Sequence, residues 1–252
     1  MNNTIKKFKM DLIRLCFIPM LVLFAPFSIG AEELKQEFLE ELVLDTIRKN
    51  PEIVLEALSI LEQQKNEAQD AARKDILSQQ RDILENDPNA PVLGNPNGDV
   101  TVIEFFDYNC SYCKKVMPEV KRLIAADKNI RLVYREWPIL GEGSVFAAKA
   151  ALASRAQGKY EEFHWALMEM RNRADETTVL RIAEKVGLDI EELLTDMEKP
   201  AVSEHIAMSM RITQALGFNG TPSFIIGNNL IPGFVEKDAL ADYVSQARKE
   251  SQ

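Results

Sequence analysis

Two cysteines separated by two residues, Cys110 and Cys113, are the side chains of this sequence best suited to chemistry. A disulfide between them would close so short a loop that it would be a poor structural tie, because loop-closure stabilisation grows with the length of chain enclosed. The same spacing at the start of a helix lowers the pKa of the first thiol and keeps the second thiol within reach. The pair therefore predicts reversible electron exchange through a Cys110–Cys113 disulfide.

Metal binding is the main alternative for these two thiols. His164 and His205 would have to complete a zinc site, and their wide separation lacks finger-like spacing. Copper(I) prefers soft sulfur ligands. Four methionines could supplement the thiols, although methionine at helical spacing usually fills a core: Met168, Met170, Met208 and Met210. We predict no metal or cofactor, and a copper-binding or metal-tolerance protein is the alternative function.

The elements around the pair are predicted to be a strand, a helix and a second strand. Residues 100–106 (VTVIEFF) are an apolar run typical of a buried central strand. Residues 114–127 carry apolar side chains at helical spacing, and residues 130–134 (IRLVY) again favour a strand. Strands joined through a helix are usually parallel with a right-handed crossover. The cysteines would then follow the end of the first strand.

The rest of the chain adds a helical block and a second pair of strands. The block comprises segments 145–157, 160–172, 177–186, 189–197 and 202–216. Strand signals return at residues 223–226, and Gly227-Asn228-Asn229 turns the chain into a hairpin with residues 230–231. A final helix is predicted from about residue 236 to 248. The helical block thus interrupts a frame of strands and helices.

The order and spacing of four motifs resemble the DsbA-like branch of the thioredoxin superfamily. The motifs are Val102-Ile-Glu-Phe-Phe106, Cys110-Ser-Tyr-Cys113, Trp137-Pro138 and Gly220-Thr-Pro222, and the resemblance covers about residues 91–252. It implies an α/β protein: a thioredoxin-like fold with an inserted α-helical domain. It also implies that Cys110 is the nucleophile and Cys113 the buried resolving thiol. Ser111 and Tyr112 would tune the stability of the Cys110 thiolate.

Glu104 and the Thr221-Pro222 pair are the other predicted site residues. A carboxylate inside an apolar strand is costly unless it has a partner or a function. By the resemblance, Glu104 would exchange a proton with Cys113 through water; the alternative is an edge residue that reaches solvent. Thr221-Pro222 matches the cis-proline loop of the family, which would place the Thr221 backbone beside Cys110 to pair with a substrate strand. An ordinary trans proline at a strand start is the alternative.

Residues 31–85, called the helical arm below, differ in composition from the rest of the chain. They contain no glycine and are rich in Glu, Gln, Lys, Leu and Ala. Two helices are predicted, and Asn50-Pro51 reads as the N-cap and first residue of the second. Their thin apolar stripe favours packing against a second copy of the chain, and an arm folded onto its own domain is the alternative. The arm is similar in composition to the N-terminal extension of ScsC-like oligomeric DsbA-type proteins, so we predict a homo-oligomer.

The domain boundaries follow from composition. Residues 86–99 are crowded with Asn, Pro, Gly and Asp and are predicted to be a linker. The thioredoxin-like domain would then occupy residues 100–252, with the helical insertion at about 143–217.

Residues 1–30 have the pattern of a secretory signal peptide. Four basic residues precede an apolar run, and Ser28 and Gly30 offer small side chains for cleavage before Ala31. An uncleaved membrane anchor is the alternative. Removal of residues 1–30 changes the formal charge from −9 to −12, which argues against nucleic-acid binding by phosphate neutralisation. We predict an exported, periplasmic protein and leave association with the outer membrane or cell surface open.

Taken together, the sequence predicts an exported thiol–disulfide oxidoreductase that forms or isomerises disulfide bonds. Its partners would be unfolded or misfolded exported proteins that contain cysteines, and a membrane protein that resets the thiols. An oligomer could hold a misfolded chain between several thiol pairs, so the arm favours isomerase or reductase activity. A pure oxidase is the alternative.

Overall fold

The computed structural model describes residues 36–250, so the predicted signal segment lies outside the described residues. The chain divides into two units, Met1–Ser59 and Ile60–Gln252. The first contains α1 (Gln36–Lys49) and the start of α2 (Glu52–Asn86). Its apolar side chains lie largely in solvent; those of Leu42 and Leu58 are 51% and 56% exposed. The first unit therefore presents apolar surface that its own helices do not bury.

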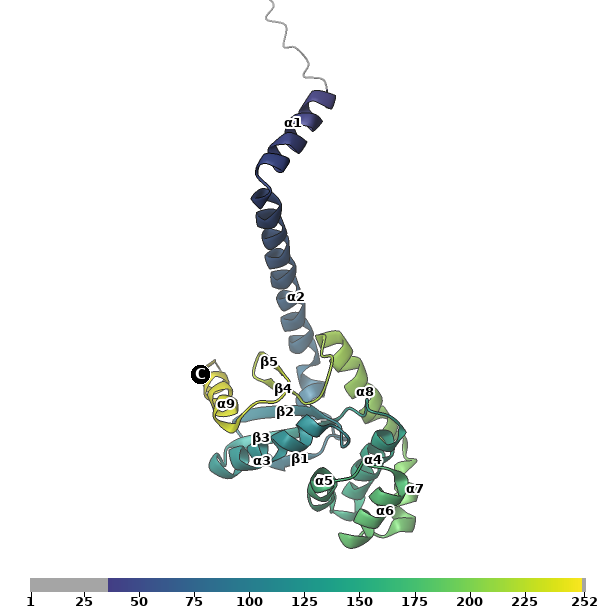
Figure 1. Cartoon of the computed structure of the whole chain (residues 1–252). Coiled ribbons are helices and arrows are strands. Elements are labelled where there is room, and N and C mark those ends of the chain that lie inside the picture. Colours follow the sequence, from purple (N-terminus) through teal and green to yellow (C-terminus); the bar gives the residue numbers. More distant parts are fainter. Residues whose placement is uncertain (1–35, 251–252) are drawn as a thin grey trace, which may run out of the picture. The chain divides into compact units, whose positions relative to one another are not determined.

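The second unit is built on a mixed sheet with strand order β1-β3-β2-β4-β5 (Figure 1). The strands are β1 (Val92–Gly94), β2 (Val100–Phe106), β3 (Ile130–Glu136), β4 (Ser223–Ile226) and β5 (Asn229–Pro232). β2 and β3 are parallel, and the other neighbouring pairs are antiparallel. The parallel pair, the hairpin of β4 and β5 and the central position of β2 are as predicted.

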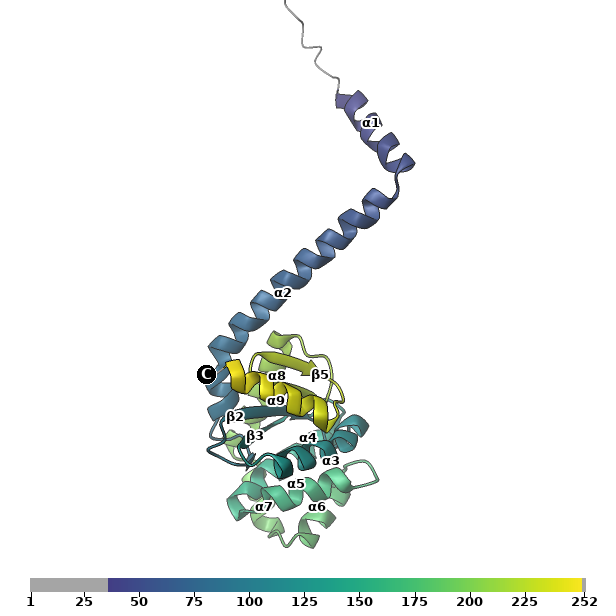
Figure 2. The same ribbon diagram turned by 90° about the vertical axis from the view of Figure 1, so that its left-hand side faces the viewer.

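Alternate residues of β2 face two different hydrophobic clusters. Val102 and Phe106 pack with residues of α3 (Ser111–Ala126) and α9 (Lys237–Glu250). Ile103 and Phe105 pack with residues of α2 and α8 (Pro200–Leu216) on the other face. Helices thus cover both faces of the sheet (Figures 1 and 2). A strand buried on both faces needs apolar residues at nearly every position, which explains the uninterrupted apolar run.

The helical insertion lies between β3 and β4. It consists of α4 (Glu142–Ala153), the short 3-10 helix η1 (Ser154–Gln157), α5 (Tyr160–Glu169), α6 (Glu176–Lys185), α7 (Ile190–Met197) and α8. The Asp175 and Asp189 side chains cap α6 and α7 by accepting hydrogen bonds from the backbone N–H groups of Thr178 and Glu192. These helices match the predicted segments closely.

Residues 86–99, expected to be a linker, contain β1, which pairs with β3. The preceding turns of α2 also belong to the core of the second unit. Leu77 and Leu84 are each 2% exposed and pack in the same cluster as Phe105. The two leucines are seven residues apart, so they lie on one face of the helix. The sheet domain therefore begins within α2.

A buried ion pair joins the end of α2 to the sheet. Arg135, on β3, is fully buried, and its Nη1 donates to Asp87 Oδ2 at 2.8 Å and to the Ile83 carbonyl at 3.2 Å. Asp87 also lies 2.9 Å from His205 Nδ1. Burial alone would raise the pKa of Asp87, but the hydrogen bond from His205 and the charge of Arg135 lower it to about 2. The carboxylate therefore stays charged at neutral pH.

Leu84→Ala is expected to lower the free energy of unfolding by about 2–5 kcal/mol, because it removes buried methyl groups and leaves a cavity. Ile83→Ala, one residue away on the same helix, is the matched control, since Ile83 is 36% exposed. Denaturant unfolding of both variants measures the difference. Equal and small losses would contradict the assignment of this part of α2 to the core.

Candidate active site

Cys110 is the N-cap residue of α3. Its backbone is extended (φ −78°, ψ 117°), and its sulfur accepts a hydrogen bond from the Cys113 backbone N–H at 3.2 Å. Both cysteines are free thiols; Cys110 is 6% exposed and Cys113 is fully buried. A residue at this position faces unpaired N–H groups and the positive end of the helix dipole, and both stabilise an anion. The structure thus places Cys110 where a thiolate is favoured.

The two thiols have opposite acidities. A hydrogen bond from the Cys113 side chain lowers the pKa of Cys110, burial opposes it, and a hydrogen bond from the Thr221 side chain lowers it further, to about 6 from 9.0. Burial raises the pKa of Cys113, and the nearby Cys110 and Glu104 raise it further. Cys110 is therefore the thiolate at neutral pH, and Cys113 keeps its proton.

Thr221 and Pro222 lie beside Cys110. The Thr221–Pro222 peptide bond is cis, as expected. The Cys110 sulfur lies 3.2 Å from the Thr221 carbonyl oxygen, to which the thiol donates when it is protonated. The Pro222 carbonyl in turn accepts from the Gly233 N–H at 2.8 Å, just beyond β5. The loop before β4 is thus held between the thiol and the β4–β5 hairpin.

Glu104 lies in β2 opposite Tyr134 and is 2% exposed. Its Oε2 atom is buried without a hydrogen-bond partner. Burial raises the pKa of this carboxyl group, and the charge of Cys110 raises it further, to about 8 from 4.5. Glu104 is therefore mostly protonated at pH 7, and it is close enough to Cys113 to raise the pKa of that thiol as well.

Ser111 and Tyr112 have exposed side chains, and that of Tyr112 is 58% exposed. Tyr112 contributes to the low pKa of Cys110 through its backbone N–H. The predicted tuning of the thiolate by hydrogen bonds from these two side chains stays a prediction.

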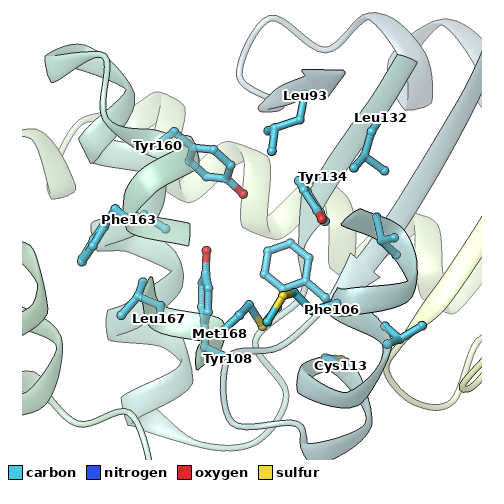
Figure 3. Close-up of a cluster of buried hydrophobic side chains, with 14 of the residues drawn as sticks. Leu93, Phe106, Tyr108, Cys113, Leu132, Tyr134, Tyr160, Phe163, Leu167 and Met168 are labelled. Carbon is cyan, nitrogen blue, oxygen red and sulfur yellow. The ribbon is translucent and has the colours of Figure 1, made fainter. Parts of the chain in front are cut away.

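The two histidines lie in different hydrogen-bonded networks. His164 Nδ1 is 3.0 Å from the Tyr108 hydroxyl, and the hydroxyls of Tyr108 and Tyr160 both donate to Glu136 Oε1 at 3.2 Å. Figure 3 shows the two tyrosines reaching this buried region from the loop after β2 and from α5. Burial lowers the pKa of His164 to about 3. His205 Nδ1 lies 2.9 Å from Asp87 Oδ2, and its Nε2 accepts from the Glu136 backbone N–H at 3.3 Å.

The residues described here contain no group of three or more His, Cys, Asp or Glu side chains arranged to hold a metal ion. The four methionines considered as copper ligands lie in different environments, and Met210 is 44% exposed. Met168 lies in the cluster that contains Cys113, whereas Met208 packs against the cluster on the other sheet face. Met170 lies in the same cluster as Met168 and both thiols.

Two polar residues that the sequence analysis did not single out, Asp107 and Asn109, hold the loop before Cys110. The Asp107 carbonyl accepts from the Cys110 N–H at 3.0 Å. Asp and Asn between a strand and a helix are ordinary turn residues, so the local sequence gave no reason to select them. What distinguishes Asp107 and Asn109 from ordinary turn residues is their contacts with the helical insertion, and these contacts exist only in the folded chain.

The reactivity of Cys110 is expected to follow the titration of its thiol. Alkylation of the reduced protein by iodoacetamide should rise with pH through a midpoint near pH 6, because only the thiolate reacts. In the urea-unfolded protein the helix is lost, so the midpoint should move to about 8.5. A midpoint above pH 8 in the folded protein would contradict the geometry described for the N-cap.

Several known proteins are similar to this chain in sequence and fold. Residues 101–245 match the model of the DSBA-like thioredoxin domain. A thioredoxin-like oxidoreductase from Silicibacter pomeroyi is 68% identical with a TM-score of 0.66, and the match covers 67% of this chain and 98% of that one. The thiol-disulfide exchange protein alpha-DsbA2 from Wolbachia pipientis is 31% identical with a TM-score of 0.66, over 71% of this chain and 97% of that one.

Two further relatives differ in how much of their own length matches this chain. A variant of Proteus mirabilis ScsC is 23% identical, with a TM-score of 0.65, over 88% of this chain and 99% of that one, which is a likeness in fold. Among curated relatives, the Na(+)/H(+) antiporter NhaA 3 from Salinispora tropica is 28% identical over 62% of this chain and 24% of the antiporter. The chain thus spans about a quarter of the length of these antiporter relatives.

Within residues 36–250, no helix combines the length and apolar character that a membrane crossing requires.

The family model covers more than half of the chain, and the sheet, the inserted helices and the helices before the sheet agree with the predicted fold. The chain belongs to the DsbA-like thioredoxin domain family of thiol–disulfide oxidoreductases.

Proposed function

We propose that this protein is an exported thiol–disulfide oxidoreductase that forms or isomerises disulfide bonds in periplasmic or secreted proteins. The observation that carries the proposal is the pairing of a low-pKa thiol, Cys110, with a fully buried thiol, Cys113, on the first turn of one helix. Thiolate stability makes the disulfide form oxidising, because it favours the reduced product. The similarity to alpha-DsbA2, named as a thiol-disulfide exchange protein, supports this activity.

The chemistry assigns one step to each thiol. In isomerisation, the Cys110 thiolate attacks a substrate disulfide, forms a mixed disulfide and releases the other substrate sulfur as a thiolate. Another substrate thiolate then attacks the mixed disulfide, which forms the rearranged substrate disulfide and releases Cys110 as a thiolate. In resolution, the ionised form of Glu104 takes the proton of Cys113 through water, and the Cys113 sulfur attacks the Cys110 sulfur of the mixed disulfide. The Cys110–Cys113 disulfide forms, and the substrate leaves reduced. Oxidation of a substrate dithiol is the reverse sequence, with Glu104 returning the proton to Cys113.

The loop that contains Thr221 is the proposed site of substrate pairing. Its backbone lies beside Cys110, so an extended substrate segment could hydrogen-bond to it while its cysteine meets the thiolate. This mode of binding requires no defined substrate sequence. It fits unfolded or misfolded proteins that contain cysteines, and a membrane redox protein would restore the working form of the thiol pair.

Two refolding assays test this function. Reduced ribonuclease and scrambled, disulfide-bonded ribonuclease are incubated with the protein, and the recovery of ribonuclease activity is followed. An oxidase accelerates recovery only from the reduced form, whereas an isomerase also rescues the scrambled form. No acceleration in either assay, with Cys110→Ser as the blank, would refute the proposed activity.

The helical arm is the reason to favour isomerisation. Val54, Leu58 and Leu61 recur at positions i, i+4 and i+7, and each is between 42% and 60% exposed. Apolar stripes of this kind are commonly covered by another helix. We infer that arms of two or more copies of the chain pack together and place several thiol pairs in one assembly.

Leu58→Glu is expected to reduce the mass of the protein in solution to that of the monomer, because a charge in the apolar stripe would be buried without a partner. Gln63→Glu is the matched control, since it adds the same charge to the opposite side of α2. Light scattering measures the mass. An unmodified protein that is itself monomeric would contradict self-association and remove the reason for favouring isomerisation.

A further inference from the structure

The carboxylate of Asp107 is 1% exposed and accepts hydrogen bonds at both oxygens. Oδ1 accepts from the Asn109 N–H and from the Ser144 hydroxyl, both at 2.7 Å. Oδ2 accepts from the N–H groups of Ile139 and Leu140, at 2.8 and 2.9 Å. Four donors therefore converge on one carboxyl group, two at each oxygen. These bonds fix the position of the Asp107 side chain.

Asn109 extends this network to a third segment of the insertion. Its Nδ2 donates to Ser144 Oγ at 3.0 Å and to the Ala174 carbonyl at 3.4 Å, while its Oδ1 accepts from the Ala174 N–H at 2.7 Å. The Ser144 hydroxyl thus accepts from Asn109 and donates to Asp107. Gly143 allows this close approach, because a Cβ there would lie 1.9 Å from the Ala174 carbonyl oxygen.

The same two residues stand immediately before the nucleophile. The Asp107 carbonyl accepts from the Cys110 N–H at 3.0 Å, and a backbone hydrogen bond from Asp107 acts on the Cys113 thiol. The side chains of the loop from β2 to α3 therefore bond to the helical insertion. Its backbone, at Asp107, bonds to both cysteines. Buried hydrogen bonds of this kind are costly to leave unmade, which makes the anchor stiff.

We propose that Asp107 and Asn109 are positioning residues, which use the helical insertion to hold Cys110 at the N-cap of α3 and beside Thr221. The proposal rests on the proposed function, since it concerns the reactivity of the same thiol. The hydrogen bond from the Cys113 N–H to the Cys110 sulfur is 3.2 Å long, and such bonds weaken steeply when distance or angle is lost. A loosened loop would therefore stabilise the thiolate less.

The charge of Asp107 offers a competing explanation with the opposite sign. A carboxylate close to Cys110 would disfavour the thiolate, so removing the charge would lower the pKa of the thiol. Loss of positioning would raise it. Three variants separate the two effects: Asp107→Asn removes the charge, whereas Asn109→Ala and Ser144→Ala keep it and break the network. Asp189→Ala, which removes the N-cap side chain of α7 in the same insertion, is the control for stability alone.

The experiment titrates the thiolate by its absorbance at 240 nm and measures the equilibrium of the full chain with glutathione. If the network positions Cys110, all three variants raise its pKa, by about one unit, and shift the equilibrium roughly fivefold toward the protein disulfide. Asp189→Ala lowers only the melting temperature. A lower pKa in Asp107→Asn, or lower melting temperatures without a change in pKa in Asn109→Ala and Ser144→Ala, would overturn the proposal.

These measurements do not depend on activity toward proteins. If the unmodified protein fails both ribonuclease assays yet its variants show the shifted titration, the proposed function fails and the positioning role stands. If it passes the assays and the three variants titrate normally, only the positioning role fails. Asn109→Ala and Ser144→Ala keep the buried charge, so the test remains available if Asp107→Asn does not fold.

Discussion

Cys110→Ser is expected to abolish thiol–disulfide exchange, whereas Cys113→Ser is expected to trap substrates on the protein. Exchange requires a thiolate, and Cys110 is the thiol whose pKa is lowered, to about 6. Cys113 is fully buried, so it can reach a mixed disulfide only from inside the protein. Without Cys113, the bond between Cys110 and the substrate forms but is not resolved.

Non-reducing gels and intact mass measure the trapped adducts in protein that lacks residues 1–30, because the third cysteine of the chain, Cys16, lies in that segment. The double variant with both cysteines replaced is the control and should form no adduct. Adducts on Cys113 in the Cys110→Ser variant would show that the roles of the two thiols have been assigned the wrong way round.

Glu104→Gln is expected to slow the resolution step by about a hundredfold or more, the usual contribution of a positioned general acid or base. The carboxyl group is buried and near Cys113, whose pKa it raises. It can take the proton that Cys113 must lose, and a glutamine of the same shape cannot. The charge of the Cys110 thiolate contributes to the raised pKa of Glu104. Formation of the mixed disulfide removes that charge, which lowers the pKa of Glu104. More of the carboxyl group is then ionised at the step in which Cys113 must lose its proton.

Stopped-flow measurement of the mixed disulfide separates formation from resolution, and only resolution should slow. Stability provides an independent readout of the same group. The pKa of Glu104 is about 8 in the folded protein against 4.5, so the protein loses stability as pH rises from 4.5 to 8. At 1.36 kcal/mol per unit this loss is at most roughly 5 kcal/mol. Glu104→Gln should remove it, and a variant with unchanged pH dependence would contradict the buried protonated form.

The central part of the fold could be predicted because local sequence and tertiary environment agree there. The apolar run at residues 100–106 indicates a strand covered on both faces, and the structure has that strand at the centre of the sheet. The two cysteines follow it at a helix start, where their spacing has a chemical meaning by itself. The cis bond at Thr221–Pro222 came from the family resemblance rather than from local pattern.

Other features could not be predicted because their partners lie far away in the sequence. β1 has three residues, and its pairing with β3 leaves no local signal among the turn residues around it. Leu77 and Leu84 interrupt a mainly polar helix, and two leucines do not make a pattern. Asp107 resembles any turn aspartate until Ile139, Leu140 and Ser144 fold against it.

The burial of the histidines affects which groups bind or release protons when the disulfide is reduced. The chain has two histidines. Burial lowers the pKa of both, that of His164 to about 3, and His205 Nε2 accepts a hydrogen bond from the Glu136 N–H, which leaves it no room for a proton. Histidine, the usual buffer of a protein near neutrality, is therefore held toward its neutral form in this protein. Protons released or taken up between pH 6 and 8, when the disulfide is reduced, come chiefly from Cys110 and Glu104. The difference between the titration curves of the oxidised and the reduced protein would thus record the proton balance of its redox reaction.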